Sequence, residues 1–346
     1  MCPNEPPSQI RGGAPVSGDA YTRAGVSQSD ADASVAALVA ALGAREGESL
    51  QALASGHYAN VVRLDERTGI AITTDGVGTK LLVAEQLGRW DTVGIDCVAM
   101  NVNDVICVGA RPLAMVDYLA VDRADPAVAA QIGEGLARGA ERAAIEIVGG
   151  ELAQLGELIA GLDLAGACIG VVELDAIVAG AEVEPGDTVI GLPSSGLHSN
   201  GYTLAREALA SIPFDDERLG RPLGELLLEP TEIYVKPVLE LLASEVEVRG
   251  LAHITSGGLQ NLLRLQAEVG YEIDSPLPVP SVFELIQQQA SVPDEEMHEV
   301  FNMGCGFCLV VPASDEGTAL ELVRGAHPGA ARIGVVSDRA GTVERA

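Results

Sequence analysis

The sequence contains few lysines, few aromatic residues and few histidines. Lys80 and Lys236 are its two lysines, aromatic residues make up 3% of 346 residues, and five histidines are present. A core with so few rings must be built from Ala, Val, Leu and Ile, in keeping with 47% hydrophobic residues. A chain of this length predicts about two domains with ample core.

Positive charge is also scarce. The sequence has 50 acidic and 21 basic residues, which gives a formal net charge of −29. Without a basic stripe we expect no nucleic-acid partner and no binding to an anionic membrane surface. The acid excess is typical of a protein from a high-salt cytoplasm, where the Debye length falls to about 3 Å at molar salt. An anionic substrate must therefore be held by local backbone donors, a few cations or a metal.

No uncharged apolar run is long enough to span a membrane, and the first residues do not resemble a secretory signal. The six cysteines are therefore expected to be reduced thiols of a cytoplasmic protein. Cys305-Gly-Phe-Cys308 has the spacing of half a zinc site, but no second pair completes it. We interpret it as part of a buried strand.

Helical and strand patterns alternate along the chain. Residues 1–20 are rich in Pro, Gly and Ser and predict a mobile tail. A change of composition between Leu174 and Asp187 predicts a boundary between domains at 21–174 and 175–346. Helices are expected over 30–42, 92–109, 126–144, 202–210 and 259–269, and strands over 61–64, 70–73, 112–120, 145–148, 164–173 and 188–192.

The segment Thr73–Lys80 reads Thr-Thr-Asp-Gly-Val-Gly-Thr-Lys. Its lysine is suited to meet a phosphate as a point charge, and Gly76 and Gly78 allow close backbone approach. Asp75 is a candidate magnesium ligand. The segment is not a Walker A loop, because Thr79 separates glycine from lysine. An ordinary turn between strand and helix, with an exposed lysine, remains the alternative.

Polar residues interrupt the apolar helix predicted from Thr92. Asp96 and Asn103 fall about 20° apart on one face, with Asp104 beside them and Asn101 nearby. Buried polar side chains are costly unless they are paired or bind an ion. Two interpretations are open, a buried network or a face toward ions and water. A second carboxylate in the preceding loop favours a magnesium–nucleotide site.

Two glycine-rich turns follow strands in the second half, Ser194–Gly201 and His253–Gly258. Each presents backbone N–H groups at a predicted helix start, which suits an anion. His198 titrates near neutrality and is a candidate acid or base, although an elaborate helix cap is the alternative. A nucleophile elbow, a His-Glu-x-x-His helix and a G-x-G-x-x-G fingerprint are all missing from the sequence, so a hydrolase or nicotinamide enzyme has little support.

Further motifs combine with these segments over nearly all of the chain past residue 20. They are Tyr21, Ala24–Val26, Thr74–Lys80, Gly94–Asp104, Asp117–Tyr118, Val148–Glu151, Ser194–Tyr202, Leu228–Lys236, His253–Gly258 and Phe301–Gly304. Together they resemble the phosphoribosylformylglycinamidine cyclo-ligase family of purine biosynthesis. The motifs at 194–202 and 228–236 look specific to that family, whereas the Asp-Gly and Asn-Asp motifs are shared with related ATP-using enzymes.

The resemblance implies an α+β fold in two domains. The N-terminal domain would carry a mixed sheet with helices and the C-terminal one an α/β sandwich-like arrangement, with an ATP and substrate cleft between them. It implies a homodimer in which the first-domain sheets join into a barrel. The implied reaction is ATP-dependent ring closure of formylglycinamidine ribonucleotide, a phosphoribosyl substrate, to aminoimidazole ribonucleotide. ATP would phosphorylate the amide oxygen, and a substrate nitrogen would then displace phosphate.

The resemblance also implies roles for particular residues, with ATP and magnesium as cofactors and potassium as a further candidate. Magnesium would be held by Asp75, Asp104 and Glu151. ATP would meet Thr74, Asp75, Gly76, Gly78, Thr79, Lys80, Asn103 and Asp104. The substrate would meet Ser195, Gly196, Ser199, Asn200, Gly257 and Gly258. The catalytic candidates are Asp104, His198, Lys80 and His253.

The sequence departs from the family pattern in three places. Thr22, Arg23 and Ser27 replace charged residues near the start, Glu151 alone remains of the acidic side chains after Gly-Gly, and Ser256 replaces a third glycine. The alternatives are a sister enzyme such as thiamine-monophosphate kinase or selenophosphate synthetase, and a nucleotide-binding protein without turnover. The His-Ser-Asn-Gly motif and the Lys236 segment favour the cyclo-ligase over the sister enzymes, and ADP release with substrate would exclude the binding protein.

Overall fold

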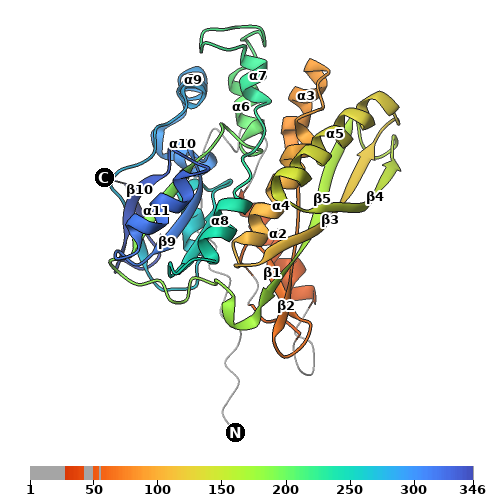
Figure 1. Cartoon of the computed structure of the whole chain (residues 1–346). Helices are drawn as coiled ribbons and strands as arrows, with labels where there is room; N and C mark the ends of the chain where they lie inside the picture. Colours follow the sequence, from red (N-terminus) through yellow and green to blue (C-terminus); the bar gives the residue numbers. More distant parts are fainter. Residues whose placement is uncertain (1–27, 43–49, 54–55, 346) are drawn as a thin grey trace.

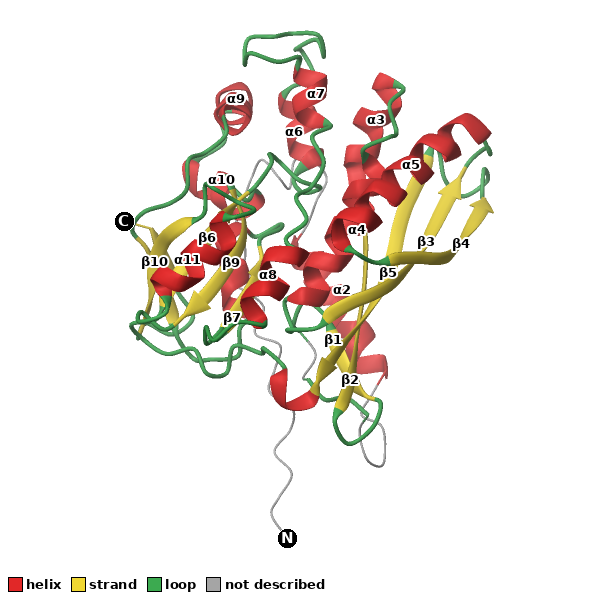
Figure 2. Ribbon diagram, in the orientation of Figure 1, coloured by secondary structure: helices red, strands yellow, loops and turns green. Residues whose placement is uncertain are grey.

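The computed structural model describes residues 28–42, 50–53 and 56–345. Two sheets, each with its own helices, form two α+β domains side by side (Figure 1, Figure 2). The first sheet has the order β1-β2-β5-β3-β4 and the second β11-β8-β10-β6-β9-β7. The predicted α+β class is therefore confirmed, whereas the predicted tail at 1–20 lies outside the described residues.

The N-terminal domain is built around a five-stranded sheet. Its strands are β1 (Asn60–Arg63), β2 (Thr68–Gly76), β3 (Arg111–Val121), β4 (Glu146–Gln154) and β5 (Leu162–Glu173), and its helices are α2 (Gln28–Leu42), α3 (Leu81–Leu87), α4 (Val93–Ile106) and α5 (Pro126–Ala143). Strands β3 and β4 are parallel, and α5 provides the crossover that parallel neighbours require. Asp125 caps α5 by accepting from the N–H of Ala127, and Pro126 occupies the first turn.

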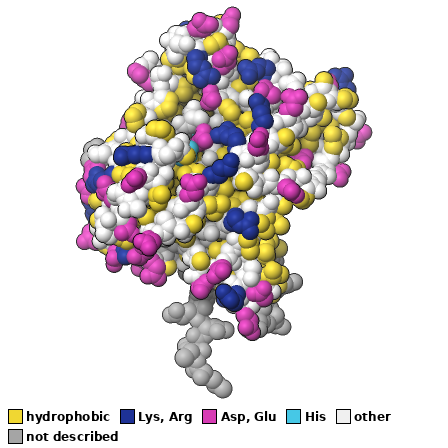
Figure 3. Space-filling model, in the orientation of Figure 1, with side chains coloured by type: hydrophobic (Ala, Val, Ile, Leu, Met, Phe, Trp, Pro, Cys, Tyr) yellow, Lys and Arg dark blue, Asp and Glu magenta, His cyan; other side chains and the backbone are white. Residues whose placement is uncertain are grey.

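Helix α4 is almost wholly buried and packs against the sheet, α5 and the second domain. Glycines permit its close crossing with α5, because a Cβ on Gly94 would lie 2.3 Å from the backbone N of Leu136. The other face of the sheet is uncovered by the described residues. There Ile72, Val116, Tyr118 and Ile169 are 41–44% exposed, and hydrophobic side chains reach the surface along this margin (Figure 3).

The C-terminal domain carries the six-stranded sheet. Its strands are β6 (Thr188–Pro193), β7 (Gly250–His253), β8 (Gly270–Ile273), β9 (Cys305–Val311), β10 (Ala331–Ser337) and β11 (Val343–Arg345). Its helices are α6 (Tyr202–Ala208), α7 (Leu223–Leu227), α8 (Val235–Leu242), α9 (Ser281–Ala290), α10 (Asp294–Val300) and α11 (Glu316–Arg324). Every residue of β9 is buried, as the sequence predicts, and Cys305 and Cys308 lie on it as free thiols.

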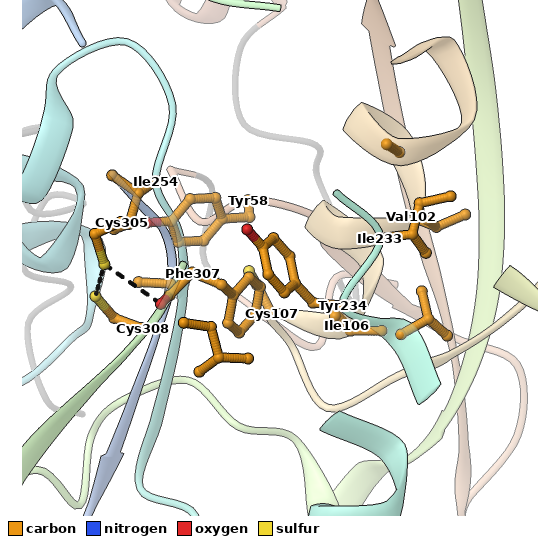
Figure 4. Packing of buried hydrophobic residues seen from close by; sticks show 14 of the residues in the cluster. Tyr58, Val102, Ile106, Cys107, Ile233, Tyr234, Ile254, Cys305, Phe307 and Cys308 are labelled. Carbon is orange, nitrogen blue, oxygen red and sulfur yellow. Dashed lines mark hydrogen bonds between the residues drawn. The ribbon is translucent and has the colours of Figure 1, made fainter. Parts of the chain in front are cut away.

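Side chains from both domains pack together where α4 meets the second sheet. Figure 4 shows Tyr58 and Cys107 of the first domain facing Tyr234, Phe307 and Ile254 of the second. All five are buried, and the rings of Tyr234 and Phe307 lie 5.3 Å apart. Burial of aromatic rings contributes strongly to such a contact, so the two domains share a core here.

Three element predictions are corrected. Strand β2 runs to Gly76, so Asp75 lies at a strand end rather than in a loop, and the short 3₁₀ helix η1 (Gly78–Lys80) follows it. Strand β4 continues to Gln154, beyond the predicted 145–148. The helix predicted over 259–269 is wrong, since the structure has the 3₁₀ helix η3 (Gly258–Arg264).

Asn261 explains why η3 does not continue as an α-helix. Its Oδ1 accepts from the N–H of Thr255 and its Nδ2 donates to the carbonyl of Ser256. Such local bonds compete with the α-helical pattern, and Leu265 is already extended. Within the described ranges, no helix has both the length and the apolar character needed to cross a bilayer.

Candidate functional site

Lys80 lies in a closed cluster between the domains. Its Nζ donates to Asp96 Oδ1 at 2.9 Å, to the carbonyl of His198 at 3.1 Å and to that of Glu229 at 2.6 Å. Lys80 and Asp96 are both fully buried. Burial lowers the pKa of Lys80, while the charge of Asp96 opposes that shift. Three acceptors match the three N–H bonds of the ammonium.

The environment of Lys80 bears on both of the roles considered for it. The exposed-lysine alternative is wrong, because no part of the side chain reaches solvent. A phosphate contact conflicts with the geometry too, since each Nζ proton already has a protein acceptor. Asp96 also accepts from the N–H and hydroxyl of Thr231, at 2.7 and 2.6 Å. The pair thus joins η1 and α4 to the segment 229–231 of the second domain.

The two asparagines of α4 satisfy neighbouring backbone. Asn103 Nδ2 donates to the carbonyl of Glu232 at 2.8 Å, and its Oδ1 accepts from the N–H of Tyr234 at 3.0 Å. Asn101 makes the corresponding pair of bonds with the backbone of Asp75, at 3.1 Å each. Both side chains are fully buried. The amide of Asn103 thus has protein partners at both ends, and its predicted ATP contact stays a prediction.

His198 is also enclosed. It has φ +62° and no exposed surface, and its Nε2 accepts from the N–H of Ser195 at 3.2 Å. A ring nitrogen that accepts an N–H carries no proton, so the neutral imidazole is protonated on Nδ1. Burial, followed by the charges of His253 and Lys80, holds its pKa well below the ordinary value. This geometry fits a residue that fixes the turn. Nδ1 is buried without a partner among the described residues, and the predicted proton transfer stays a prediction.

The acidic pair Asp75 and Asp104, also beside α4, has a different environment. Burial, and then the charge of Asp104, raise the pKa of Asp75 to about 6. Asp104 Oδ1 lies 2.9 Å from Nδ1 of His253, a fully buried histidine of the second domain. The Asp104 side chain is 13% exposed. The structure thus brings together three residues that the sequence singles out, two carboxylates and the histidine that orients one of them.

Glu151 does not join this pair. In the sheet register Gly150 is opposite Asp117 and Glu151 is opposite Tyr118. Because side chains alternate along a strand, Glu151 shares the uncovered face with Tyr118 while Asp75 points to the helix side. Within this chain Glu151 therefore does not share a face with Asp75, and its role as a magnesium ligand stays a prediction. Within residues 28–42, 50–53 and 56–345, no three His, Cys, Asp or Glu side chains form a group that could hold a metal.

Two carboxylates nevertheless fit a magnesium ion that also binds phosphate. Magnesium usually takes one or two carboxylates, with phosphate oxygens and water completing its octahedron. Burial first, and then the negative charge of Asp104, raise the pKa of Asp75, and a bound cation would favour its ionised form. Asp75 and Asp104 are the residues that would hold such an ion, which would neutralise charge on the transferring phosphate.

The two glycine-rich turns lie against each other. Ser256 Oγ donates to Asn200 Oδ1 at 3.2 Å, so the serine that replaces a glycine bridges the turns. Asn200 Nδ2 is buried and has no partner among the described residues, and it is therefore a free donor at this junction. Gly257 and Gly258 have φ +98° and +54°, and a Cβ on Gly258 would lie 2.1 Å from the carbonyl of His298.

Most of the other residues predicted to contact ATP or substrate form hydrogen bonds within the protein. Ser195 Oγ donates to the carbonyl of Pro230 at 2.6 Å, and Ser199 Oγ lies 3.3 Å from the hydroxyl of Thr231. Thr79 Oγ1 lies 3.1 Å from Thr203 Oγ1. The carbonyl of Gly196 accepts from Asn302, and the N–H of Gly76 donates to Asp75. Thr74 donates to the carbonyl of Gly166. Gly78 has a left-handed backbone, with φ +71°. Thr22, Arg23 and Ser27 lie outside the described residues.

Some residues at this interface were not singled out in the sequence. Thr231 and Glu229 lie in a segment noticed as a motif, but their contacts with Asp96 and Lys80 span more than 130 residues. Arg264 follows the predicted His253–Gly258 turn, but no motif or pattern in the sequence marked it as a functional residue. Two surface hollows, of about 370 Å³ beside Leu87 and Phe214 and about 160 Å³ beside Trp90 and Val128, are lined by none of the residues predicted for the site.

Comparison with known proteins identifies the family. Residues 56–172 match the N-terminal domain and 184–345 the C-terminal domain of AIR synthase related proteins. The phosphoribosylformylglycinamidine cyclo-ligase of Methanothermobacter thermautotrophicus is 53% identical over 84% of this chain and 86% of that protein. The cyclo-ligase of Methanocaldococcus jannaschii is 45% identical over 92% of both.

A solved structure shows the same fold at lower identity. Hydrogenase maturation protein HypE in complex with ATP has a TM-score of 0.58 and 19% identity, covering 82% of this chain and 84% of its own. Likeness at this level concerns the fold alone. The matches to the two domain families and to relatives about half identical show that this chain belongs to the phosphoribosylformylglycinamidine cyclo-ligase family.

Proposed function

We propose that the protein closes the imidazole ring of aminoimidazole ribonucleotide from formylglycinamidine ribonucleotide, with release of ADP and phosphate. The observation that carries the proposal is the Asp75–Asp104 pair beside the glycine-rich turns, in a chain whose relatives bear the cyclo-ligase name. A thiamine-monophosphate kinase or a binding protein without turnover is not favoured, since relatives at 45–53% identity are cyclo-ligases.

The chain's own residues would bind and orient the reactants. Asp75 and Asp104 would hold magnesium–ATP, and His253 would fix the orientation of Asp104 through the 2.9 Å contact. The junction of the turns, with the free amide donor of Asn200, would bind the phosphoribosyl substrate. Once ATP has phosphorylated the amide oxygen, phosphate is a good leaving group, and the neighbouring substrate nitrogen closes the ring. Positioning and charge neutralisation are the main needs of phosphoryl transfer.

The experiment combines two readouts on one reaction. Magnesium–ATP and formylglycinamidine ribonucleotide are supplied in high potassium chloride, and ADP release is measured with colorimetric assay of the product amine. Substrate-dependent ADP that matches aminoimidazole ribonucleotide would support the proposal. ATP binding without product would contradict it and direct attention to the substrates of sister enzymes.

We further propose a homodimer formed through the uncovered face of the N-terminal sheet. Tyr118, Val116, Ile72 and Ile169 place an apolar stripe there, and a second copy would bury the same stripe on each side. Replacement of Val116 by Lys should yield monomers in light scattering. An unchanged mass would exclude this face.

The cellular setting is also a proposal. Five described cysteines are free and buried, which suits a reducing cytoplasm, and the charge of −29 suits high salt. Potassium would then serve as the screening ion and is a candidate activator. We assign 21–174 to ATP binding and dimerisation and 175–346 to the substrate. Unfolding on dialysis into dilute buffer would support the salt requirement, and full stability there would remove it.

A further inference from the structure

The ammonium of Lys80 has three protein acceptors, so the acidic pair lacks a cation from that side chain in the described structure. Anionic phosphates approach a protein of net charge −29, so a local positive group is needed beyond any metal. Lys80 cannot serve, because its ammonium is enclosed by Asp96 and two carbonyls. Another cation should therefore lie near Asp75 and Asp104.

Arg264 lies near the acidic pair. It ends η3, the 3₁₀ helix that begins at the Ser256–Gly258 turn, and its side chain is exposed. It stacks on Tyr58, and the carbonyl of Tyr58 accepts from Thr73 Oγ1 at 3.3 Å, two residues before Asp75 on β2. Among the described residues no carboxylate pairs with it, whereas Arg142, Arg221 and Arg249 all make ion pairs.

Arg264 is also held in place by stacking, and no described residue accepts a hydrogen bond from its guanidinium. Its guanidinium lies over the ring of Tyr58, 4.9 Å from the centroid. The Tyr58 hydroxyl in turn donates to the carbonyl of Asn261, on the same 3₁₀ helix, at 2.8 Å. Stacking engages the face of the guanidinium and leaves its N–H groups free, in a planar fork that matches phosphate oxygens.

We propose that Arg264 is the cation that binds phosphoryl oxygens of a phosphorylated ligand beside Asp75 and Asp104. The ligand chemistry is a phosphate ester or anhydride, and two sources supply it, the polyphosphate of ATP and the ribose phosphate of the substrate. Arg264 would contact the oxygens that a metal on the carboxylates does not reach. The assignment rests on the proposed function only for its kinetic test.

The kinetic test compares Arg264→Ala with wild type at fixed ionic strength. Loss of a charge-assisted hydrogen bond should raise one KM roughly 10- to 100-fold. A rise in the KM for ATP alone identifies the nucleotide phosphate, and a rise for the ribonucleotide alone identifies the ribose phosphate. Arg67→Ala, an exposed arginine in the turn between β1 and β2, is the matched control. If Arg264→Ala changes both constants no more than the control does, the proposal is overturned.

Two further measurements keep the test decisive. If Arg264→Ala does not fold by circular dichroism, Arg264→Gln keeps a planar polar head without the charge and should show the same rise. Isothermal titration with ATP and with ribose 5-phosphate reports binding even when turnover is absent. One of these ligands should bind wild type at least about tenfold tighter than the variant. Equal affinities for both would contradict the role of Arg264 even if the cyclisation itself failed.

Discussion

Two pairs of charged residues lie beside α4, and they differ in how their charges are balanced. Lys80 and Asp96 are opposite charges and fully buried, the ammonium has three acceptors, and both carboxylate oxygens of Asp96 lie 2.9 Å from Lys80 Nζ. Asp75 and Asp104 are like charges, and the pKa of Asp75 is raised to about 6. A charge that is satisfied by the protein has nothing left for a ligand, whereas an uncompensated pair attracts a cation. We infer that the first pair stabilises the domain contact and the second one binds ligands.

The largest expected effect comes from breaking the satisfied pair. Lys80→Met leaves Asp96 buried without its counter-ion and should lower the free energy of unfolding by about 3–5 kcal/mol. Denaturant unfolding at fixed potassium chloride measures this. The double variant Lys80→Met/Asp96→Leu should recover part of the loss, because it removes the stranded charge. A single variant that is as stable as wild type and has only a raised KM for ATP would restore the phosphate role of Lys80.

The second effect concerns the acidic pair. Asp104→Asn keeps an oxygen for His253 but loses the negative charge, so kcat should fall at least about 100-fold. The free energy of unfolding should change by less than about 1 kcal/mol, in contrast to Lys80→Met. Steady-state kinetics and a melting curve on one preparation test both parts. Asp216→Asn, which removes a surface charge paired with Arg218, serves as the control. Full activity in Asp104→Asn would end its assignment to the site.

A third effect is a pH dependence of opposite sign to that of most acidic residues. The pKa of Asp75 in the fold is about 6 against an ordinary 3.8. Folding therefore disfavours its ionised form, and metal-free stability falls as pH rises from about 3.8 to about 6. Asp75→Asn lacks this loss and should be more stable than wild type by about 1–3 kcal/mol at pH 7.5, with a smaller difference near pH 4. Melting temperatures without magnesium across this range decide the matter, and parallel curves for the two proteins would contradict it.

The smallest effect concerns the bridge between the turns. Ser256→Gly removes the 3.2 Å bond to Asn200 and restores the family's glycine. The free energy of unfolding should fall by about 0.5–1.5 kcal/mol. The KM for the ribonucleotide should change only a few-fold. A large loss of activity would show that Ser256 touches the substrate itself.

Many helices and strands could be predicted from local sequence patterns, because capping residues and the spacing of apolar residues mark their positions. Asp125-Pro126 marks the start of α5, alternating residues mark β5, and the apolar run after Gly304 marks buried β9. The helix expected over 259–269 failed because Asn261 bonds to residues before it, an option that periodicity does not reveal.

For the site, the sequence named several residues that the fold brings together, but it did not reveal the hydrogen-bond partners of the others. Asp75, Asp104 and His253 were named from the sequence, and the fold brings them together. Lys80, Asn103 and His198 were also named, but their partners come from distant segments such as 229–234 and could not be known beforehand. The strand register places Glu151 on the face opposite to Asp75, because neighbouring residues of a strand point to opposite faces, and the sequence alone did not reveal this separation.

Binding of a paramagnetic cation tests the contrast between the two pairs most directly. Mn²⁺, which shares magnesium's preference for oxygen ligands, is titrated with ATP into wild type, into Asp75→Asn/Asp104→Asn and into Asp216→Asn, and free Mn²⁺ is followed by electron paramagnetic resonance. We predict that wild type and Asp216→Asn bind Mn²⁺–ATP and that the folded double variant binds it at least about 100-fold more weakly. Equal binding by all three proteins would contradict the assignment of Asp75 and Asp104 as the cation site.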